Sequence, residues 1–163
     1  MVDSNSERTE NIMKLYIGSD HGGYNLKQKI KEVFTPMGYE FEDVGTDSTE
    51  SCDYPVFASK LCEKVLAEPD GKGILVCGTG IGMSIAANKF KGIRASHCTD
   101  TFAARMTREH NNSNVLCLGE RITGQDLAID IVEIWLKTPF SNGERHLRRL
   151  DEIKAIEDRQ SDK

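Results

Sequence analysis

The stretch LVCGTGIGMSIAANK, residues 75–89, places a cysteine between an apolar run and a glycine-rich turn. Gly78, Gly80 and Gly82 permit the backbone conformations that a tight turn from a strand into a helix requires. Amide groups at the start of a helix have no partner within the helix, so they stabilise negative charge. This setting favours the thiolate form of a neighbouring cysteine, and we therefore predict that Cys77 acts as a base or nucleophile.

A buried, inert thiol is the alternative, because most free cysteines behave as small hydrophobic residues. The position of Cys77 at the end of a predicted strand favours the functional interpretation. The inert interpretation is preferred for Cys52, Cys62 and Cys117. The five cysteines form no CxxC pair, so the sequence indicates neither a disulfide framework nor a cysteine-based zinc site.

Two nucleotide-binding motifs compete for the glycine-rich turn. A dinucleotide-binding GxGxxG motif that began at Gly78 would need glycine where Met83 stands, and it normally follows the first strand of a sheet. A phosphate-binding P-loop would end in GK followed by serine or threonine, and this turn lacks that ending. Asp100 lies at about the distance expected for a ribose-binding acid, but it does not by itself support a nucleotide site.

Two arginines near the end of the chain could hold a phosphate group. Arg145 and Arg149 are one helical turn apart, which places them on one face of a helix with Arg148 beside them. Guanidinium groups bind phosphate through paired hydrogen bonds. A solvated basic stripe is the alternative, but the chain as a whole has a net charge of -5. A basic cluster in an acidic chain favours phosphate binding.

Two histidines are placed for proton transfer or anion binding. His110 ends a predicted helix, and we expect it near the ligand-binding edge of the sheet, where an imidazole transfers protons near neutral pH. His21 follows an acidic residue in a loop after a strand and could bind an anion. Helix capping and a simple turn are the respective alternatives. His97 and His146 show no signal beyond an ordinary structural role.

An alternation of strand-like and helix-like segments positions these candidate site residues. Strands are predicted from short β-rich runs at residues 14–18, 39–45, 73–77, 93–97 and 114–119. Helices are predicted from apolar spacing at residues 26–34, 55–68, 81–90, 101–109, 125–137 and 143–158. Parallel strands need crossover connections, so the predicted fold class is α/β: a single-domain, Rossmann-like three-layer sandwich with a five-stranded parallel sheet.

Ligands of such sheets bind beyond the carboxyl ends of the strands. Asp20 and His21 follow the first predicted strand, Cys77 ends the third, and Arg121 follows the fifth. We therefore expect these four side chains to meet at one edge of the sheet.

Length and composition predict one folded domain in a reducing compartment. The 163 residues fit a single domain, in which residues 13–158 fold and residues 1–12 form a disordered polar tail. The acidic net charge gives nucleic acid or an anionic membrane no general attraction, and no stretch reaches the ~20 apolar residues of a membrane span. Unpaired cysteines and the lack of a signal peptide predict a cytoplasmic protein.

Several motifs together resemble a known family. They are SDHGG, SCDYPVFA, CGTGIGMSIAANK, REHNNSNVLCLGER and GERHLRRLDEI. In order and spacing they are similar to those of ribose-5-phosphate isomerases of type B, within the sugar-phosphate isomerase family that includes galactose-6-phosphate isomerase. The resemblance covers residues 13–158, which is nearly the whole chain.

The resemblance implies a role for each motif residue in the reaction. Cys77 would be the base that moves a proton between the first two sugar carbons. Thr79 and the neighbouring amides would hold the oxygen that becomes negative in the enediolate, while Asp20 and His110 would open the furanose ring. The amides in question belong to Gly78, Thr79, Gly80, Ile81 and Gly82.

Substrate binding is implied for a second group of residues. Asn111 would position sugar hydroxyls, and the arginine pair would hold the phosphate. The implied binding residues are His21, Asn111, Arg121, Arg145 and Arg149. Members of this family form homodimers whose sites lie between subunits, so the arginines could serve their own site or the neighbour's, and further pairing into tetramers stays open. No metal or organic cofactor is implied.

One difference within the family concerns the identity of the base. Some members lack the cysteine and carry a glutamate just beyond the glycine turn, where this chain has Met83. The chain is therefore expected in the cysteine-dependent branch. Cys52 stands where the family carries a small aliphatic residue, and we attach no function to it.

The expected activity is interconversion of D-ribose 5-phosphate and D-ribulose 5-phosphate in the non-oxidative pentose phosphate pathway. An isomerase of a six-carbon aldose phosphate, allose or galactose 6-phosphate, is one alternative, because the chemistry is the same and pocket length decides. A non-catalytic sugar-phosphate sensor is another, although a sensor would not need a matched acid and base. An NAD-dependent dehydrogenase is disfavoured by the missing dinucleotide motif.

Overall fold

The computed structural model describes residues 14–162, and the predicted tail over residues 1–12 lies outside this range. Five parallel strands form one sheet in the order β2-β1-β3-β5-β4. They are β1 (Lys14–Ser19), β2 (Glu40–Asp43), β3 (Lys72–Cys77), β4 (Ala95–His97) and β5 (Val115–Gly119). The predicted α/β fold with a five-stranded parallel sheet is confirmed.

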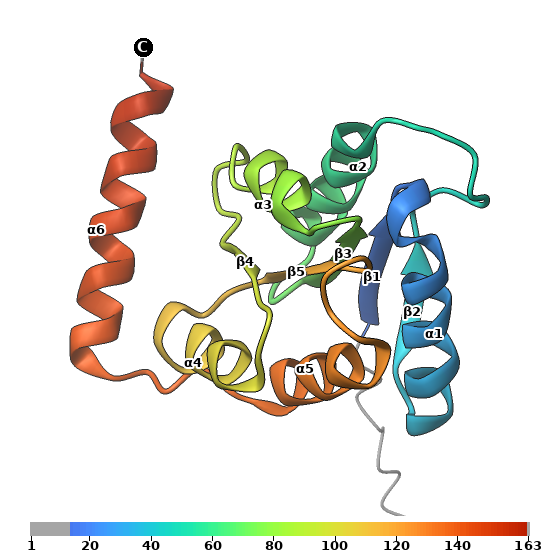
Figure 1. The fold of residues 1–163 in the computed structure, drawn as a ribbon. Coiled ribbons are helices and arrows are strands. Elements are labelled where there is room, and N and C mark those ends of the chain that lie inside the picture. Colours follow the sequence, from blue (N-terminus) through green and yellow to red (C-terminus); the bar gives the residue numbers. More distant parts are fainter. Residues whose placement is uncertain (1–13, 163) are drawn as a thin grey trace, which may run out of the picture.

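Helices cover both faces of this sheet (Figure 1). One hydrophobic cluster joins the sheet to α1, α4 and α5, and the other joins it to α2 and α3. The helices are α1 (Tyr24–Phe34), α2 (Tyr54–Ala67), α3 (Ile81–Ala87), α4 (Thr101–Asn111), α5 (Gln125–Lys137) and α6 (Glu144–Ser161). Two 3-10 turns, η1 (His21–Gly23) and η2 (Thr35–Met37), flank α1. None of the helices described is long and apolar enough to cross a membrane.

The helix α6 stands apart from the three layers (Figure 1). His146 is its only residue in the buried class. Its exposed face carries Leu147, Ile153 and Ile156, which are 44%, 42% and 50% exposed. A cleft of about 310 Å³ separates the helix from the chain around Gly92. The core of this chain therefore leaves α6 largely uncovered.

The sequence predicts most boundaries to within a few residues, but β2, α3 and β4 are shorter than predicted. The helix stops at Ala87 because Asn88 turns its side chain to the edge strand. Asn88 Nδ2 donates to the carbonyl of Ala95, and the amide of Ala95 donates to Asn88 Oδ1, each over 2.9 Å. The side chain thus pairs with the backbone as a neighbouring strand would.

A buried lysine fixes the chain that leaves β2. Lys27 is fully buried on α1, and its ammonium lies 3.0 Å from Asp43 Oδ2 at the end of the strand. Burial disfavours the charged form of Asp43, but hydrogen bonds from Lys31, the Gly45 amide and Lys27 outweigh it and hold the pKa of this carboxyl below its ordinary value. Lys27 also donates to the carbonyl of Thr46. The loop toward the carboxyl edge is therefore anchored by charge.

Replacing Asp43 by asparagine should destabilise the protein, because it leaves the buried ammonium of Lys27 without a counter-charge. We expect Asp43→Asn to lower the free energy of unfolding by about 3 kcal/mol at pH 7, measured by urea denaturation. Lys14→Gln, which breaks only an exposed ion pair with Glu42, is the control and should leave the midpoint nearly unchanged.

The pH dependence of this difference follows from the lowered pKa. The stabilisation is complete above the unfolded-state pKa of about 3.9 and disappears as the pH falls through the lower folded-state value. The two proteins should therefore converge in acid. Equal urea midpoints at pH 7 would contradict this account of Asp43.

Candidate functional site

Cys77 ends β3 under the glycine-rich turn and is only 5% exposed. It is more deeply buried than its position in the sequence predicts. The amide of Gly80 donates a hydrogen bond to Cys77 Sγ over 3.1 Å. Gly80 has a φ of 79°, in the left-handed region that favours glycine, and this conformation turns its amide back toward the sulfur. The turn therefore places one directed backbone donor on the sulfur of Cys77.

The other cysteines lack this contact. Burial raises the pKa of Cys62 and of Cys98 to about 12, and it raises that of Cys117 well above the ordinary value. The inert placement predicted for Cys62 and Cys117 is confirmed. The prediction for Cys52 is wrong, because this residue is only half-buried and its amide donates to His21 Nδ1 over 3.2 Å.

The β1 side of the site lies directly against the glycine turn. Asp20 is buried, and its Oδ1 accepts a hydrogen bond from the Gly22 amide over 2.9 Å. A Cβ added to Gly22 would lie 3.1 Å from the nitrogen of Gly78, so the two loops touch. The Cys52 amide donates to His21 Nδ1, which ties His21 to the segment before α2. The predicted meeting of Asp20 with the Cys77 turn is therefore confirmed, and the approach of His21 to the turn stays a prediction.

The β5 side completes this edge with an exposed cation. The amide of Arg121 donates to the carbonyl of Gly78 over 2.9 Å, and Arg121 Nη1 would be 3.2 Å from a Cβ on Gly78. The preceding residue, Glu120, accepts a hydrogen bond from the amide of Leu26 at the start of α1. A short chain of contacts thus links β5, α1 and the turn.

Two of the turn's polar groups are already engaged with each other. The amide of Ile81 donates to Thr79 Oγ1 over 3.3 Å, and the Gly80 amide is directed to the sulfur. Thr79 itself is exposed at the carboxyl edge of the sheet. Gly82 packs against the ring of Tyr54, to which an added Cβ would approach within 2.7 Å. Contacts to Cys77, Thr79 and Tyr54 therefore hold the turn in place.

His97 supports the turn from the neighbouring strand, which the sequence did not indicate. A Cβ on Gly80 would lie 2.7 Å from Cδ2 of this imidazole. His97 Nε2 is buried without a hydrogen-bond partner among the described residues. The ring thus fills the space that a side chain at position 80 would need.

His110 does not lie at this edge, and the expectation that it would is wrong. The helix α4 runs back from the carboxyl end of β4 to the amino end of β5, so its last turn is at the opposite edge. From Thr101 to His110 the helix rises about 14 Å. No hydrogen bond spans that distance, and His110 and Asn111 are therefore separate from Cys77 within one chain.

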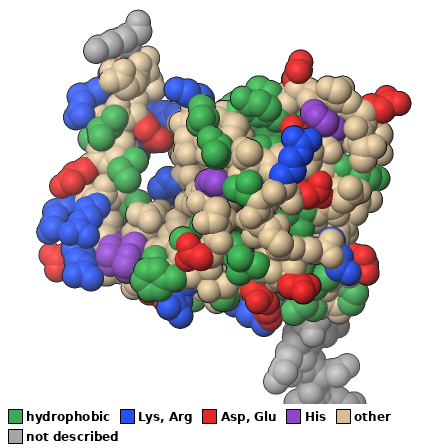
Figure 2. Space-filling view, viewed as in Figure 1, with side chains coloured by type: hydrophobic (Ala, Val, Ile, Leu, Met, Phe, Trp, Pro, Cys, Tyr) green, Lys and Arg blue, Asp and Glu red, His purple; other side chains and the backbone are tan. Residues whose placement is uncertain are grey.

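The arginine pair, Arg145 and Arg149, lies with His110 and not with Cys77. His146 at the start of α6 stacks on His110, with ring centroids 4.3 Å apart and 11° between the planes. Arg145 Nε donates to His146 Nε2 over 3.4 Å. Burial, aided by the positive charges of His110, Arg145 and Arg149, lowers the pKa of His146 and favours its neutral form. Lys and Arg side chains gather on α6 in Figure 2.

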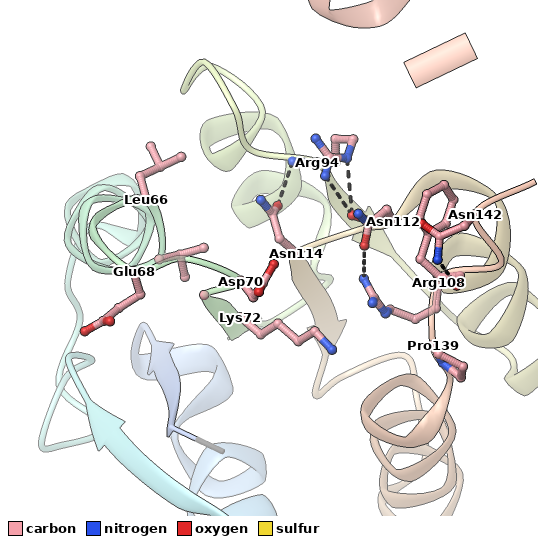
Figure 3. Close-up of a pocket in the computed structure, with 13 residues that line it drawn as sticks. Leu66, Glu68, Asp70, Lys72, Arg94, Arg108, Asn112, Asn114, Pro139 and Asn142 are labelled. Carbon is pink, nitrogen blue, oxygen red and sulfur yellow. Dashed lines mark hydrogen bonds between the residues drawn. The ribbon is translucent and has the colours of Figure 1, made fainter. Parts of the chain in front are cut away.

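The backbone that carries Asn111 is clamped by two other arginines (Figure 3). Arg94 Nε donates to the carbonyls of Asn111 and Asn112 over 2.9 and 3.2 Å. Arg108 Nη1 donates to Asn112 Oδ1 over 3.0 Å and to the carbonyl of Ser113. Asn112 has a φ of 46°, so this clamp holds a left-handed residue at the end of α4.

The predicted site residues therefore form two groups on opposite edges of the sheet. The first surrounds the thiol and contains Asp20, His21, Cys77, Gly78, Thr79, Gly80, Ile81, Gly82 and Arg121. The second contains His110, Asn111, Arg145 and Arg149. Within residues 14–162, no cluster of three or more His, Cys, Asp or Glu side chains is arranged to hold a metal ion.

A thiol under helix-start amides and a separate cationic group are features of an α/β enzyme that acts on an anionic substrate. The sequence profile of the Ribose/Galactose Isomerase family matches residues 15–153, and the chain belongs to this family.

Individual relatives agree with this family. Ribose-5-phosphate isomerase B of Escherichia coli is 46% identical over 151 residues, which is 92% of this chain and 100% of that protein. The structure of ribose-5-phosphate isomerase B from Clostridium thermocellum superposes with a TM-score of 0.87 at 54% identity, over 91% of this chain and 99% of that one. The type B enzyme of Leishmania infantum gives 0.85 at 43% identity, over 90% and 97%.

Gly80 should not tolerate a side chain, because a Cβ would meet the His97 ring and a left-handed residue would be strained. We expect Gly80→Ala to cost about 1–3 kcal/mol in unfolding free energy and to slow alkylation of Cys77 by iodoacetamide at pH 7, followed by mass spectrometry. Gly124→Ala is the matched control, since nothing lies within 4 Å of that Cβ. Unchanged alkylation in Gly80→Ala would show that the turn does not activate the sulfur.

Proposed function

We propose that this chain is an aldose–ketose isomerase that interconverts D-ribose 5-phosphate and D-ribulose 5-phosphate. The hydrogen bond from the Gly80 amide to Cys77 Sγ carries the proposal. Removal of a weakly acidic C–H proton needs a base within reach and a positive environment for the oxygen that becomes negative. The glycine turn combines both in a member of the Ribose/Galactose Isomerase family.

The thiolate of Cys77 takes the proton from C2 of the open aldose, and the electrons move onto the C1 oxygen to form the enediolate. The resulting thiol returns the proton to C1, while the hydroxyl proton of C2 passes to the C1 oxygen. Thr79 and those amides of residues 78–82 that are not bonded to Cys77 Sγ or Thr79 Oγ1 stabilise the enediolate. Asp20 and His110 assist opening of the furanose ring. Since the proton that leaves C2 reappears on C1, no oxidant or reductant is consumed.

The working site combines the two groups across a homodimer. His110 lies about 14 Å along α4 from the carboxyl edge, too far to serve the thiol of its own chain. The partner's α4 and α6 would bring the second group to the first. Uncovered apolar side chains support such a pairing: Ile81, Ile85 and Phe102 beside the turn are 49%, 57% and 64% exposed. Further pairing of dimers into a tetramer stays open.

Side chains from both groups bind the substrate. His21 and Arg121 lie at the carboxyl edge, and Arg145 and Arg149 reach the phosphate from the neighbouring subunit. A phosphate held at one end keeps the sugar in place while the proton moves between carbons. Asn111, fixed by the Arg94 clamp, is suited to bind sugar hydroxyls.

We also propose a cytoplasmic location and a role in the non-oxidative pentose phosphate pathway. All five cysteines are free, and four of them are buried, which is typical of proteins in a reducing compartment.

Loss of the thiol should abolish turnover without unfolding the protein. Cys77→Ala is expected to lower kcat for ribose 5-phosphate by about 10³-fold or more, with normal circular dichroism. Cys98→Ala, which removes a buried thiol outside the site, should keep its activity if it folds. Comparable turnover in Cys77→Ala would reject the assignment of the base.

The same assay distinguishes the alternatives. Higher kcat/KM for allose or galactose 6-phosphate than for ribose 5-phosphate would favour the six-carbon isomerase. A wild-type protein that binds ribose 5-phosphate, but neither forms ribulose 5-phosphate nor exchanges the C2 proton with deuterated water, would be a sensor.

Mixed dimers test the shared site. A dimer of one Cys77→Ala chain and one His110→Ala chain retains one intact site only if each site takes these residues from different chains. Random assembly of equal amounts should therefore recover about a quarter of wild-type activity, although each variant alone is inactive. If both residues came from one chain, co-expressed variants would stay inactive.

A further inference from the structure

The largest cavity described lies at the amino edge of the sheet, away from the thiol (Figure 3). Its volume is about 550 Å³, within the range of small-molecule sites. Its walls come from the end of α2, the start of β3, the segments before β4 and β5, and the link between α5 and α6. Arg145 and Arg149, the proposed phosphate clamp, do not line it.

Three cations face this cavity, and none of them forms a salt bridge among the described residues. They are Lys72, Arg94 and Arg108, and no carboxylate within residues 14–162 lies within 4.0 Å of any of them. Burial and the charge of Arg108 lower the pKa of Lys72, and the charge of Asp70 offsets part of this effect. Burial likewise lowers the pKa of both arginines, and the charge of Arg94 lowers that of Arg108 further. The positive charges of these three side chains therefore repel one another, and a bound anion would reduce that repulsion.

The donors of this cluster are held in fixed positions. Each guanidinium is anchored by backbone carbonyls: Arg94 to residues 111 and 112, and Arg108 to residues 113 and 138. No acceptor among the described residues bonds to Arg94 Nη1, Arg108 Nη2 or Lys72 Nζ. Figure 3 shows the amine of Lys72 extended along the cavity toward Arg108. The two guanidinium groups are thus preorganised, and all three cations keep part of their hydrogen-bonding capacity free.

We propose that this cavity binds a phosphorylated metabolite of about the size of a nucleoside monophosphate. The phosphate takes the donors of Lys72, Arg94 and Arg108, which match a tetrahedral oxyanion. Val65, Leu66, Pro139 and Phe140 give an apolar wall for a ring. Glu68 and Asp70 at the α2 side accept hydrogen bonds from hydroxyl or amino groups, which an inorganic anion lacks. This site is independent of the proposed isomerase activity.

Calorimetric titration of the full chain with adenosine 5′-monophosphate and with inorganic phosphate tests the site. Arg145→Gln/Arg149→Gln serves as the background, because it removes the proposed catalytic clamp. We expect the background protein to bind both probes, the nucleotide more tightly, and Lys72→Gln to weaken both by about tenfold or more. Lys72→Arg should retain binding, and Lys60→Gln, an exposed lysine of α2 outside the cavity, should change nothing.

Folding is checked by thermal denaturation without ligand. Lys72→Gln should melt no lower than its background, because it removes a cation repelled by Arg108. Wild-type-like affinity in Lys72→Gln, or no binding to the background protein, would overturn the proposal. Binding of phosphate with no tighter binding of the nucleotide would overturn the metabolite assignment, since it would leave an anion site alone.

Discussion

In a parallel sheet the chain returns from the carboxyl end of one strand to the amino end of the next. This return determines which edge of the sheet carries each functional group. Each crossover helix must run opposite to the strands, so residues that follow strands and residues that end helices occupy opposite edges. Cys77 follows β3 and His110 ends α4, and the sheet separates them. On the proposed mechanism, a second copy is therefore a chemical necessity rather than a source of stability alone. The helix α6 is largely exposed in the single chain, as a surface that pairs with a second copy would be.

The environment of each sulfur depends on a few backbone amides. Cys117 and Cys77 lie on adjacent strands and both are buried, yet only Cys77 ends its strand beneath a left-handed glycine. The Gly80 amide bonds the sulfur of Cys77, while burial, aided by the neighbouring cysteines, raises the pKa of Cys117. The two buried thiols therefore differ in one directed backbone donor, on which the role proposed for Cys77 depends.

Sequence reasoning predicted the fold and the thiol-bearing edge because both depend on local patterns. The helix α5 was predicted with its observed limits, since its apolar spacing and its ends are both clear. The last turns of α3 were not, because Asn88 leaves the helix to bond a strand that is distant in the sequence. His146 and His97 were missed for the same reason. Their roles come from contacts with His110 and Gly80, which no spacing within the sequence reveals.

The length of helix α4 sets the distance of His110 from the carboxyl edge of the sheet. One added residue would turn His110 by about 100° around the helix axis and shift it by about 1.5 Å, which would break its stacking on His146. Deleting one residue would turn and shift His110 in the opposite direction and would also break the stacking. Loops at a protein surface tolerate changes in length more readily than a helix with packed contacts at its end. On the proposed mechanism, the length of α4 is constrained by the shared site as well as by the core of its own chain.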